Sequence, residues 1–300
     1  MQTVKKIDIH VHTSESGWKA NGAYPFATPE ELIAIYDQVG IEKGVLLPVG
    51  SFALVTSSNY ENKRIVDKYP DRFVWFCFIE PWAGTNSENT DFLPYLLECK
   101  ENGARGYGEA VSNCYFDDPR VLKLMACCEK AGLPFTFHIG NMGGDYGLVD
   151  EIGLPRLEKV LQMFPNLKFL GHSQKFWAEI SGDLTEEQRG GYPTGKVVPG
   201  GRVVELMRKY PNLYGDISAG SGYNAMARDP EFAYAFMEEF QDRLFFGTDI
   251  CTVVPLTHPV LKLGPFLDEA MQTGKISYDA YYKISRGNAI ELLGLEPDAK

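Results

Sequence analysis

The sequence predicts a (β/α)8 TIM barrel, and three patterns along its 300 residues support that fold. Short runs rich in β-branched and aromatic residues alternate with segments of helical periodicity, and there are eight of each. The connections from helix to strand are short, whereas those from strand to helix are long and rich in Gly, Ser and Pro. No repeat, linker or low-complexity tract divides the chain, so we expect a single domain over residues 1–300.

The expected elements follow one another in the order typical of βαβ units. The strands are expected at residues 4–11, 44–49, 73–79, 104–110, 134–139, 167–172, 213–217 and 244–248. The helices are expected at residues 29–39, 59–69, 91–102, 119–131, 155–164, 201–210, 230–241 and 277–293. The long connections at 12–27, 173–199 and 250–261 all follow carboxyl ends of strands, where a TIM barrel builds its active site.

Several of these helices carry their own start and stop signals. Thr28 precedes Pro29 and two acidic residues, which is a typical N-cap with a proline in the first turn. Asp118 and Asp229 likewise each precede a proline. Three helices are expected to end at an aromatic residue followed by proline, namely at Tyr69-Pro70, Phe164-Pro165 and Tyr210-Pro211.

A doubly wound open sheet is the rival fold, because it can also accommodate eight βα units. Its commonest use is the binding of a dinucleotide at a glycine-rich turn after the first strand. The first strand of this chain is followed by no G-x-G-x-x-G motif. The barrel is therefore the more economical prediction.

Composition excludes several classes of function. A net charge of −11 and the lack of any basic cluster longer than Lys5-Lys6 argue against nucleic acid as a partner. No apolar stretch is long enough for a secretory signal or a membrane span, so we expect a cytoplasmic protein without a membrane partner. The six cysteines form no C-x-x-C pair and are expected to be free, buried thiols.

Histidines and acids gather at the predicted strand ends. His10 and His12 close the first strand, and because side chains alternate along a strand, both point to one face. Such a pair is weak evidence for a metal site by itself. The other candidate ligands, however, fall at the ends of the fourth, fifth, sixth and eighth strands, namely Glu109, His138, His172 and Asp249. Burying these groups at one mouth without an ion would cost several kcal/mol, so the pattern predicts a divalent metal.

At this point the sequence resembles the amidohydrolase superfamily of metal-dependent barrel enzymes. The similarity extends from about Ile7 to Asn288 and rests on the phrases Ile-Asp-Ile-His-Val-His, Phe-Thr-Phe-His, Gly-His-Ser and Phe-Gly-Thr-Asp. These phrases are similar to the amidohydrolase-related branch, also called amidohydrolase 2, which contains aminocarboxymuconate-semialdehyde and resorcylate decarboxylases. The resemblance implies that His10, His12, His138 and Asp249 hold a metal, most often zinc. It also implies that His172 is a ligand or a catalytic base.

Glu109 departs from the decarboxylases of this branch. It occupies the position where binuclear members of the superfamily carry a bridging carboxylate or carbamylated lysine. A bridging Glu109 would allow a second metal at His138 and His172, and the alternative is that Glu109 supports a ligand or contacts substrate. Ligation by nitrogen and carboxylate suits zinc, in one or two ions, with manganese or iron as further candidates.

The predicted function is that of a metal-dependent hydrolase acting on a small-molecule amide, ester or lactone. A bound cation would make hydroxide available near neutral pH, and Asp249 would take the proton of the attacking water. Non-oxidative decarboxylation of a small unsaturated or aromatic acid is the second candidate. A third interpretation, a metal-binding scaffold without catalysis, would have the same ligands but no open coordination position.

Candidate substrate-binding residues lie in the loops after the sixth and seventh strands. Lys175 and Trp177 offer a cation and an aromatic wall, and Tyr223 and Arg228 could orient a small carboxylated or cyclic substrate. The alternative is that Trp177 packs under its loop and that the two cations pair with acids such as Glu179 or Asp216. His258 is expected to be a loop-packing residue, and the sequence leaves a homo-oligomer open.

Overall fold

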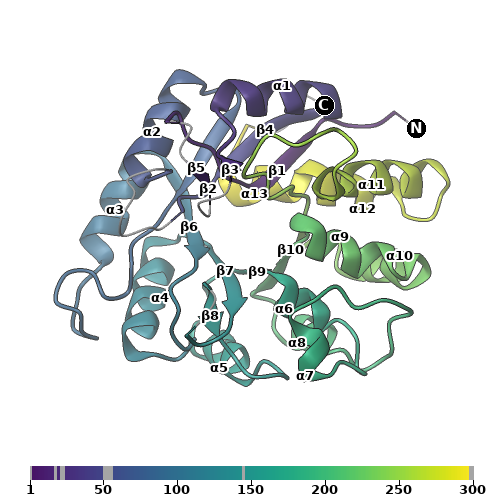
Figure 1. Ribbon diagram of the computed structural model, residues 1–300. Coiled ribbons are helices and arrows are strands. Elements are labelled where there is room, and N and C mark those ends of the chain that lie inside the picture. The colour runs from purple at the N-terminus through teal and green to yellow at the C-terminus, as the bar shows by residue number, and fades with distance from the viewer. Residues whose placement is uncertain (1, 17–18, 21–23, 50–56, 144–145, 297–300) are drawn as a thin grey trace. The chain divides into compact units, whose positions relative to one another are not determined.

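The computed structural model describes residues 2–16, 19–20, 24–49, 57–143 and 146–296 (Figure 1). The chain divides into two compact units, which are Met1–Trp75 with Gly215–Lys300, and Phe76–Tyr214. The two boundaries fall inside strands β5 (Phe73–Cys77) and β10 (Leu213–Asp216). A single domain over residues 1–300 stays a prediction, and the predicted connection 12–27 lies partly outside the described residues.

The first unit holds both ends of the chain. Its amino-terminal part comprises β1 (Lys6–Val11), β2 (Lys19–Ala20), β3 (Tyr24–Pro25), α1 (Pro29–Val39), β4 (Ile41–Leu46) and α2 (Asn59–Lys68). Its carboxyl-terminal part comprises α9 (Ala219–Ala227), α10 (Pro230–Glu239), β11 (Leu244–Phe245), the 3-10 helix η1 (Pro259–Leu261), α11 (Leu263–Gln272), α12 (Tyr278–Tyr282), the π-helix η2 (Lys283–Gly287) and α13 (Asn288–Leu293).

The second unit holds the middle of the chain. Its elements are α3 (Leu93–Glu101), β6 (Ala104–Ala110), α4 (Pro119–Ala131), β7 (Phe135–Gly140), β8 (Leu148–Val149), α5 (Pro155–Met163), β9 (Phe169–His172), α6 (Gln174–Ala178), α7 (Glu186–Arg189) and α8 (Arg202–Lys209).

All eight predicted strands are present, as β1, β4, β5, β6, β7, β9, β10 and β11. Every one of them belongs to a parallel pair, with β1, β4 and β5 paired in turn and β10 paired with β11 in the first unit. In the second unit β7 pairs with β6 and β9. The predicted alternation of parallel strands and helices is confirmed. The sequence patterns missed β8, α6 and α7, which are too short to show a clear periodicity. They also missed α9, a nine-residue helix in which two glycines weaken the helical pattern.

The predicted helix signals are confirmed with one exception. The Thr28 hydroxyl accepts a hydrogen bond from Glu31 N, and the Glu31 carboxylate accepts one from Thr28 N, which completes a capping box. The Asp118 carboxylate accepts from Arg120 N. Asp229 is the N-cap of α10, but its side chain makes no capping bond. The three predicted aromatic helix ends are the C-caps of α2, α5 and α8.

Strands that read as apolar in sequence are buried on both faces. Every residue of β1, β5, β7 and β9 is buried, as expected for parallel strands with helices on the outer face and packed side chains on the inner face. In the first unit α1 packs on β4 (Figure 1), and Gly44 of β4 gives the Tyr36 ring of α1 the space it occupies. A Cβ on Gly44 would lie 2.5 Å from Tyr36 Oη.

Hydrogen bonds beyond the strands bring the chain after β11 alongside β1. Ile9 N donates to Phe246 O at 3.0 Å, and Asp249 N donates to His10 O at 2.8 Å. A parallel bridge between Val11 and Ile250 continues this pairing. The predicted strand at 244–248 is therefore only partly regular, but its far end still runs next to the His-x-His segment.

Two further expectations concern cysteines and membranes. All six cysteines are free, and all are buried except Cys251, which is half-buried. No helix among the described residues has the length and apolarity of a membrane span.

We predict that Gly44→Val lowers the free energy of unfolding by about 1 to 3 kcal/mol, because the new side chain would displace the Tyr36 ring. Gly191→Ala is the control, since a Cβ there meets only Gln188 O, at 3.6 Å. Urea denaturation followed by circular dichroism measures both. Equal midpoints for the two variants would show that α1 repacks without cost.

Candidate active site

Three of the predicted metal ligands lie together in the first unit. His10 lies in β1 and His12 directly follows its last residue, and the Nε2 atoms of the two rings are 3.1 Å apart. Asp249 Oδ1 lies 3.7 Å from His10 Nε2 and 3.4 Å from His12 Nε2. The three ligand atoms therefore converge on one point, as a bound cation requires.

The other ring nitrogens of the two histidines face acceptors. His10 Nδ1 lies 2.6 Å from Asp216 Oδ2, and His12 Nδ1 lies 2.9 Å from Leu47 O. Neutral imidazoles that donate from Nδ1 to these acceptors leave two Nε2 lone pairs facing one another across 3.1 Å. Two ligands of a tetrahedral zinc are about 3.3 Å apart, given bonds of about 2.05 Å. The donor set therefore fits a divalent cation between the rings.

Asp249 is held in a special backbone conformation. Its φ of 58° lies in the left-handed region, which costs a non-glycine residue free energy and recurs at functional sites. The hydrogen bond from its backbone to His10 O holds it there. Its side chain is 24% exposed, whereas that of His10 is fully buried, so solvent water can reach the carboxylate.

Sequence reasoning missed Asp8, a buried carboxylate that organises this site. It accepts hydrogen bonds from His10 N at 3.0 Å, Tyr36 Oη at 2.7 Å, Thr248 N at 2.9 Å and Thr248 Oγ1 at 2.5 Å. Burial raises the pKa of Asp8 to about 6, although the bonds from Thr248 and Tyr36 lower it. An aspartate in the middle of the apolar run Ile7-Asp8-Ile9 was the available signal.

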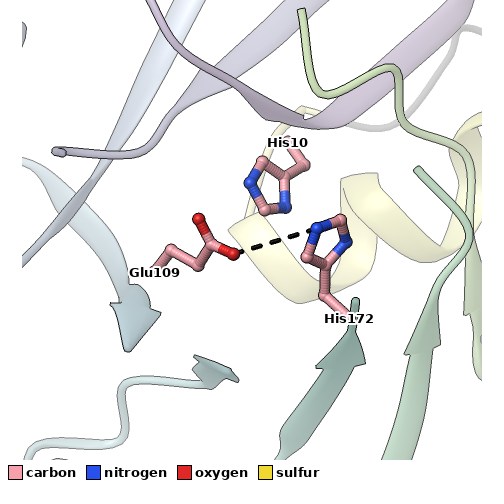
Figure 2. Close-up of side chains that lie close together, drawn as sticks. All are labelled: His10, Glu109 and His172. Atoms are coloured by element: carbon pink, nitrogen blue, oxygen red, sulfur yellow. Dashed lines mark ion pairs between the residues drawn. The ribbon is translucent and has the colours of Figure 1, made fainter. Parts of the chain in front are cut away.

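The remaining predicted ligands lie together in the second unit. His138 of β7 and His172 of β9 are register partners, and their ring centroids are 5.5 Å apart. Glu109, near the end of β6, places Oε1 2.9 Å from His138 Nδ1 and 3.8 Å from His172 Nε2. Figure 2 shows the carboxylate of Glu109 directed at His172. All three residues are buried, so Glu109 is positioned to share its charge between two imidazoles.

A cavity of about 270 Å³ opens beside His138 in the second unit. Its lining comes from the end of β7, the loop after β7, the start of α6 and the residue after α7, and comprises His138, Ile139, Gly140, Asn141, Tyr146, Gln174, Lys175 and Gly190. The Lys175 ammonium is buried and donates to Asn141 Oδ1. The Tyr146 ring lies 4.7 Å from the His138 ring, centroid to centroid. The cavity therefore presents a cation, two amides and an aromatic ring.

The other predicted substrate residues lie elsewhere. Trp177 is 1% exposed and packs edge to face on Phe176, which fits the packing alternative, so its substrate contact stays a prediction. In the first unit Tyr223 packs against Phe266, and Arg228 is the C-cap of α9. Glu179 pairs with Arg189, a residue that sequence reasoning did not single out. His258 caps η1, consistent with the predicted packing role.

Comparisons with known proteins agree with this fold. A family model described as amidohydrolase matches residues 7–295. No curated protein matches the sequence. Among solved structures, an uncharacterised TIM-barrel protein from Bordetella bronchiseptica is 21% identical, with a TM-score of 0.65 over 97% of this chain and 99% of that one.

Two further structures have assigned activities. A probable 2-pyrone-4,6-dicarboxylic acid hydrolase from Acinetobacter baumannii with citric acid bound is 18% identical, with a TM-score of 0.60 over 97% of this chain and 100% of that one. A 5-carboxyvanillate decarboxylase from Novosphingobium aromaticivorans with bound manganese is 14% identical, with a TM-score of 0.62 over 97% of each chain. These likenesses confirm the (β/α)8 TIM barrel, in preference to the doubly wound sheet.

We predict that Asp216→Asn weakens binding of Zn²⁺ or Mn²⁺ by about 10- to 100-fold, because His10 loses the carboxylate that orients its ring. Asp279→Asn, on the exposed face of α12, is the control and should bind as the wild type does. Equilibrium dialysis with metal analysis measures both. Unchanged affinity in a folded Asp216→Asn protein would show that His10 needs no such partner.

Proposed function

The chain belongs to the amidohydrolase family, and from that premise we propose that it is a metal-dependent hydrolase of a small-molecule lactone, ester or amide. One observation carries the proposal. Two histidines and an aspartate converge within 3.7 Å, each histidine is oriented through its other ring nitrogen, and the aspartate is within reach of solvent. Catalytic zinc sites use three protein ligands of these types and keep one position open.

The proposed metal is a divalent cation at His10, His12 and Asp249. The ligand chemistry suits zinc, while manganese is the ion named for the decarboxylase neighbour. When bound, such a cation would polarise a substrate carbonyl and lower the pKa of water. A protein with the same ligands but no catalysis would need a shell closed by protein, whereas the 24% exposure of Asp249 favours an open one.

In the proposal, side chains of the protein transfer the proton released by the attacking water. In our proposal Asp249 accepts a proton from the attacking water and returns it to the leaving group. Its left-handed backbone and its bond to His10 O keep the carboxylate fixed while this happens. With a single ion at His10, His12 and Asp249, His172 would be a second proton carrier, because its Nε2 lies 3.8 Å from the Glu109 carboxylate, which would stabilise a protonated ring. With a second ion at Glu109, the same nitrogen of His172 would be a ligand instead.

The cavity beside His138 is the proposed substrate site. Its volume suits a small molecule, and the Lys175 ammonium with the amides of Asn141 and Gln174 would bind a carboxylate. The Tyr146 ring would cover one face of a planar ring. We therefore propose a small carboxylated, cyclic substrate, of which 2-pyrone-4,6-dicarboxylic acid, named for one neighbour, is the first compound to assay.

Decarboxylation is the second candidate, because two histidines and a cation would also stabilise a carboxylated ring during loss of CO₂. The two reactions differ in their products. Protein loaded with Zn²⁺ or with Mn²⁺ should be assayed with pyrone dicarboxylates and with hydroxybenzoates. Ring opening without release of CO₂ supports hydrolysis, whereas release of CO₂ overturns it in favour of the decarboxylase.

We predict that Asp249→Asn lowers kcat by at least about 100-fold, because an amide cannot accept the proton of the attacking water. The fold should be unchanged, since the backbone bond of residue 249 to His10 O does not involve the side chain. Asp279→Asn serves again as the control. Steady-state kinetics in the metal-loaded state measures the effect, and near-normal turnover by Asp249→Asn would remove the assigned role.

We predict that Glu109 is a metal ligand and that Glu109→Gln lowers the metal content from two ions per chain to one. The expectation rests on the position of its carboxylate between His138 and His172. Inductively coupled plasma mass spectrometry of reconstituted protein gives the count. One ion in both proteins would assign Glu109 a supporting role and leave the first-unit site intact.

A further inference from the structure

One segment of the second unit contributes to the cavity at both its ends. Gln174 and Lys175 line the cavity at the start of α6, and Gly190 lines it directly after α7. The intervening chain is a long loop that includes a turn of helix of only four residues. Because isolated helices this short are unstable, Gly190 must be held in place by contacts outside α7.

A buried ion pair makes the first of these contacts. Arg189, the last residue of α7, places Nε 2.6 Å from Oε1 of Glu179, the C-cap of α6. The side chains are 2% and 3% exposed. The pair therefore ties the end of α7, and with it Gly190, to the end of the helix that carries Lys175.

The other polar atoms of the pair bind the loop before α5. Arg189 Nη1 donates to Asp150 O at 2.7 Å, and Nη2 donates to Glu151 O at 2.9 Å. The second oxygen of Glu179 accepts from Gly153 N at 2.7 Å. A single guanidinium thus joins three segments of the unit, and each of its three nitrogens donates a hydrogen bond.

The energetics favour a role in position over one in stability. Burial of a guanidinium and a carboxylate costs free energy that their attraction only partly returns. Burial raises the pKa of Glu179 to about 7, against the opposing effect of the Arg189 charge. A pair of apolar side chains would fill the same space at lower cost. What apolar side chains cannot supply is the directional hydrogen bonding that fixes one loop arrangement.

We infer that Arg189 is a positioning residue of the substrate cavity, which fixes the Gly190 wall relative to Lys175 and so determines which small molecules the cavity accepts. The inference rests on the proposed function for the identity of the cavity as the substrate site. The positioning itself concerns only the second unit and is measurable without turnover.

Hydrogen exchange of the full-length protein provides that measurement. Arg189→Met should accelerate exchange in peptides that cover residues 186–191 by at least ~10-fold, because the loop loses its anchor. Arg202→Met is the matched control, since Arg202 also binds the 150–153 segment, through Gly153 O at 2.7 Å, and its ion pairs join acids of α5 and α8. Equal exchange at 186–191 in both variants and the wild type would overturn the inference.

Two further variants distinguish a loss of loop positioning from a loss of global stability. Arg189→Met combined with Glu179→Leu removes both charges, so it should keep the melting temperature near that of the wild type while exchange at 186–191 stays fast. Arg189→Lys keeps the charge but not the three directed bonds, and should restore protection only in part. Full protection in the double variant would show that packing alone positions Gly190.

Kinetics then tests the consequence for substrate. With the compound found active for the wild type, the double variant should raise KM by ~10-fold or more and change kcat much less, because the reacting groups are untouched. Faster exchange with an unchanged KM would overturn the specificity role. If the wild type turns over no compound in the screen, the proposed function fails, and the exchange data still decide whether Arg189 positions the wall.

Discussion

The carboxylate of Asp8, buried inside β1, is the contact on which the first-unit site depends. It accepts hydrogen bonds from the hydroxyl of Tyr36 in α1 and from both the backbone N–H and the hydroxyl of Thr248, in the chain after β11. Asp8 Oδ1 also accepts a hydrogen bond from His10 N. Because Thr248 directly precedes Asp249 and Asp8 is two residues before His10, this one side chain sets the spacing between two proposed metal ligands. Gly44 supports this arrangement indirectly, since the absence of a side chain there leaves room for the Tyr36 ring that donates to Asp8.

Buried acids that bind backbone amides recur in both units and hold their loops. Glu61 of α2 accepts from Ser14 Oγ and Glu15 N in the loop after β1. In the second unit Asp150 accepts from Glu151 N and Leu157 N, where α5 begins. The excess of acidic residues in the composition is thus partly internal. A carboxylate suits this work because one group accepts several hydrogen bonds from loops that form no ladder of their own.

The sequence was sufficient to predict the eight strands that alternate with helices, most helix ends and the six candidate ligands, because each depends on a local pattern. His10 and His12 follow from alternation along a strand, and His138 and His172 from their positions at strand ends. The Arg189 to Glu179 pair could not be predicted, since it joins residues of a loop without periodicity. Trp177 illustrates the same limit. An aromatic residue after a strand has the same sequence signature whether it faces a substrate or, as the 1% exposure of Trp177 indicates, packs inside.

The charge balance of the first unit gives an independent reason for a cation. Asp8 and Asp216 are both fully buried, and they flank Gly247 so closely that a Cβ there would lie 3.3 Å from one carboxylate and 3.2 Å from the other. Glycine at this position lets the two acids approach from both sides. Buried carboxylates are costly unless positive charge lies nearby. Asp216 contacts His10 Nδ1. A cation bound at Nε2 of the same ring would place positive charge on the far side of the imidazole and so partly offset the negative charge of Asp216. The acids that orient the histidines and the metal that the histidines would bind are therefore parts of one electrostatic arrangement.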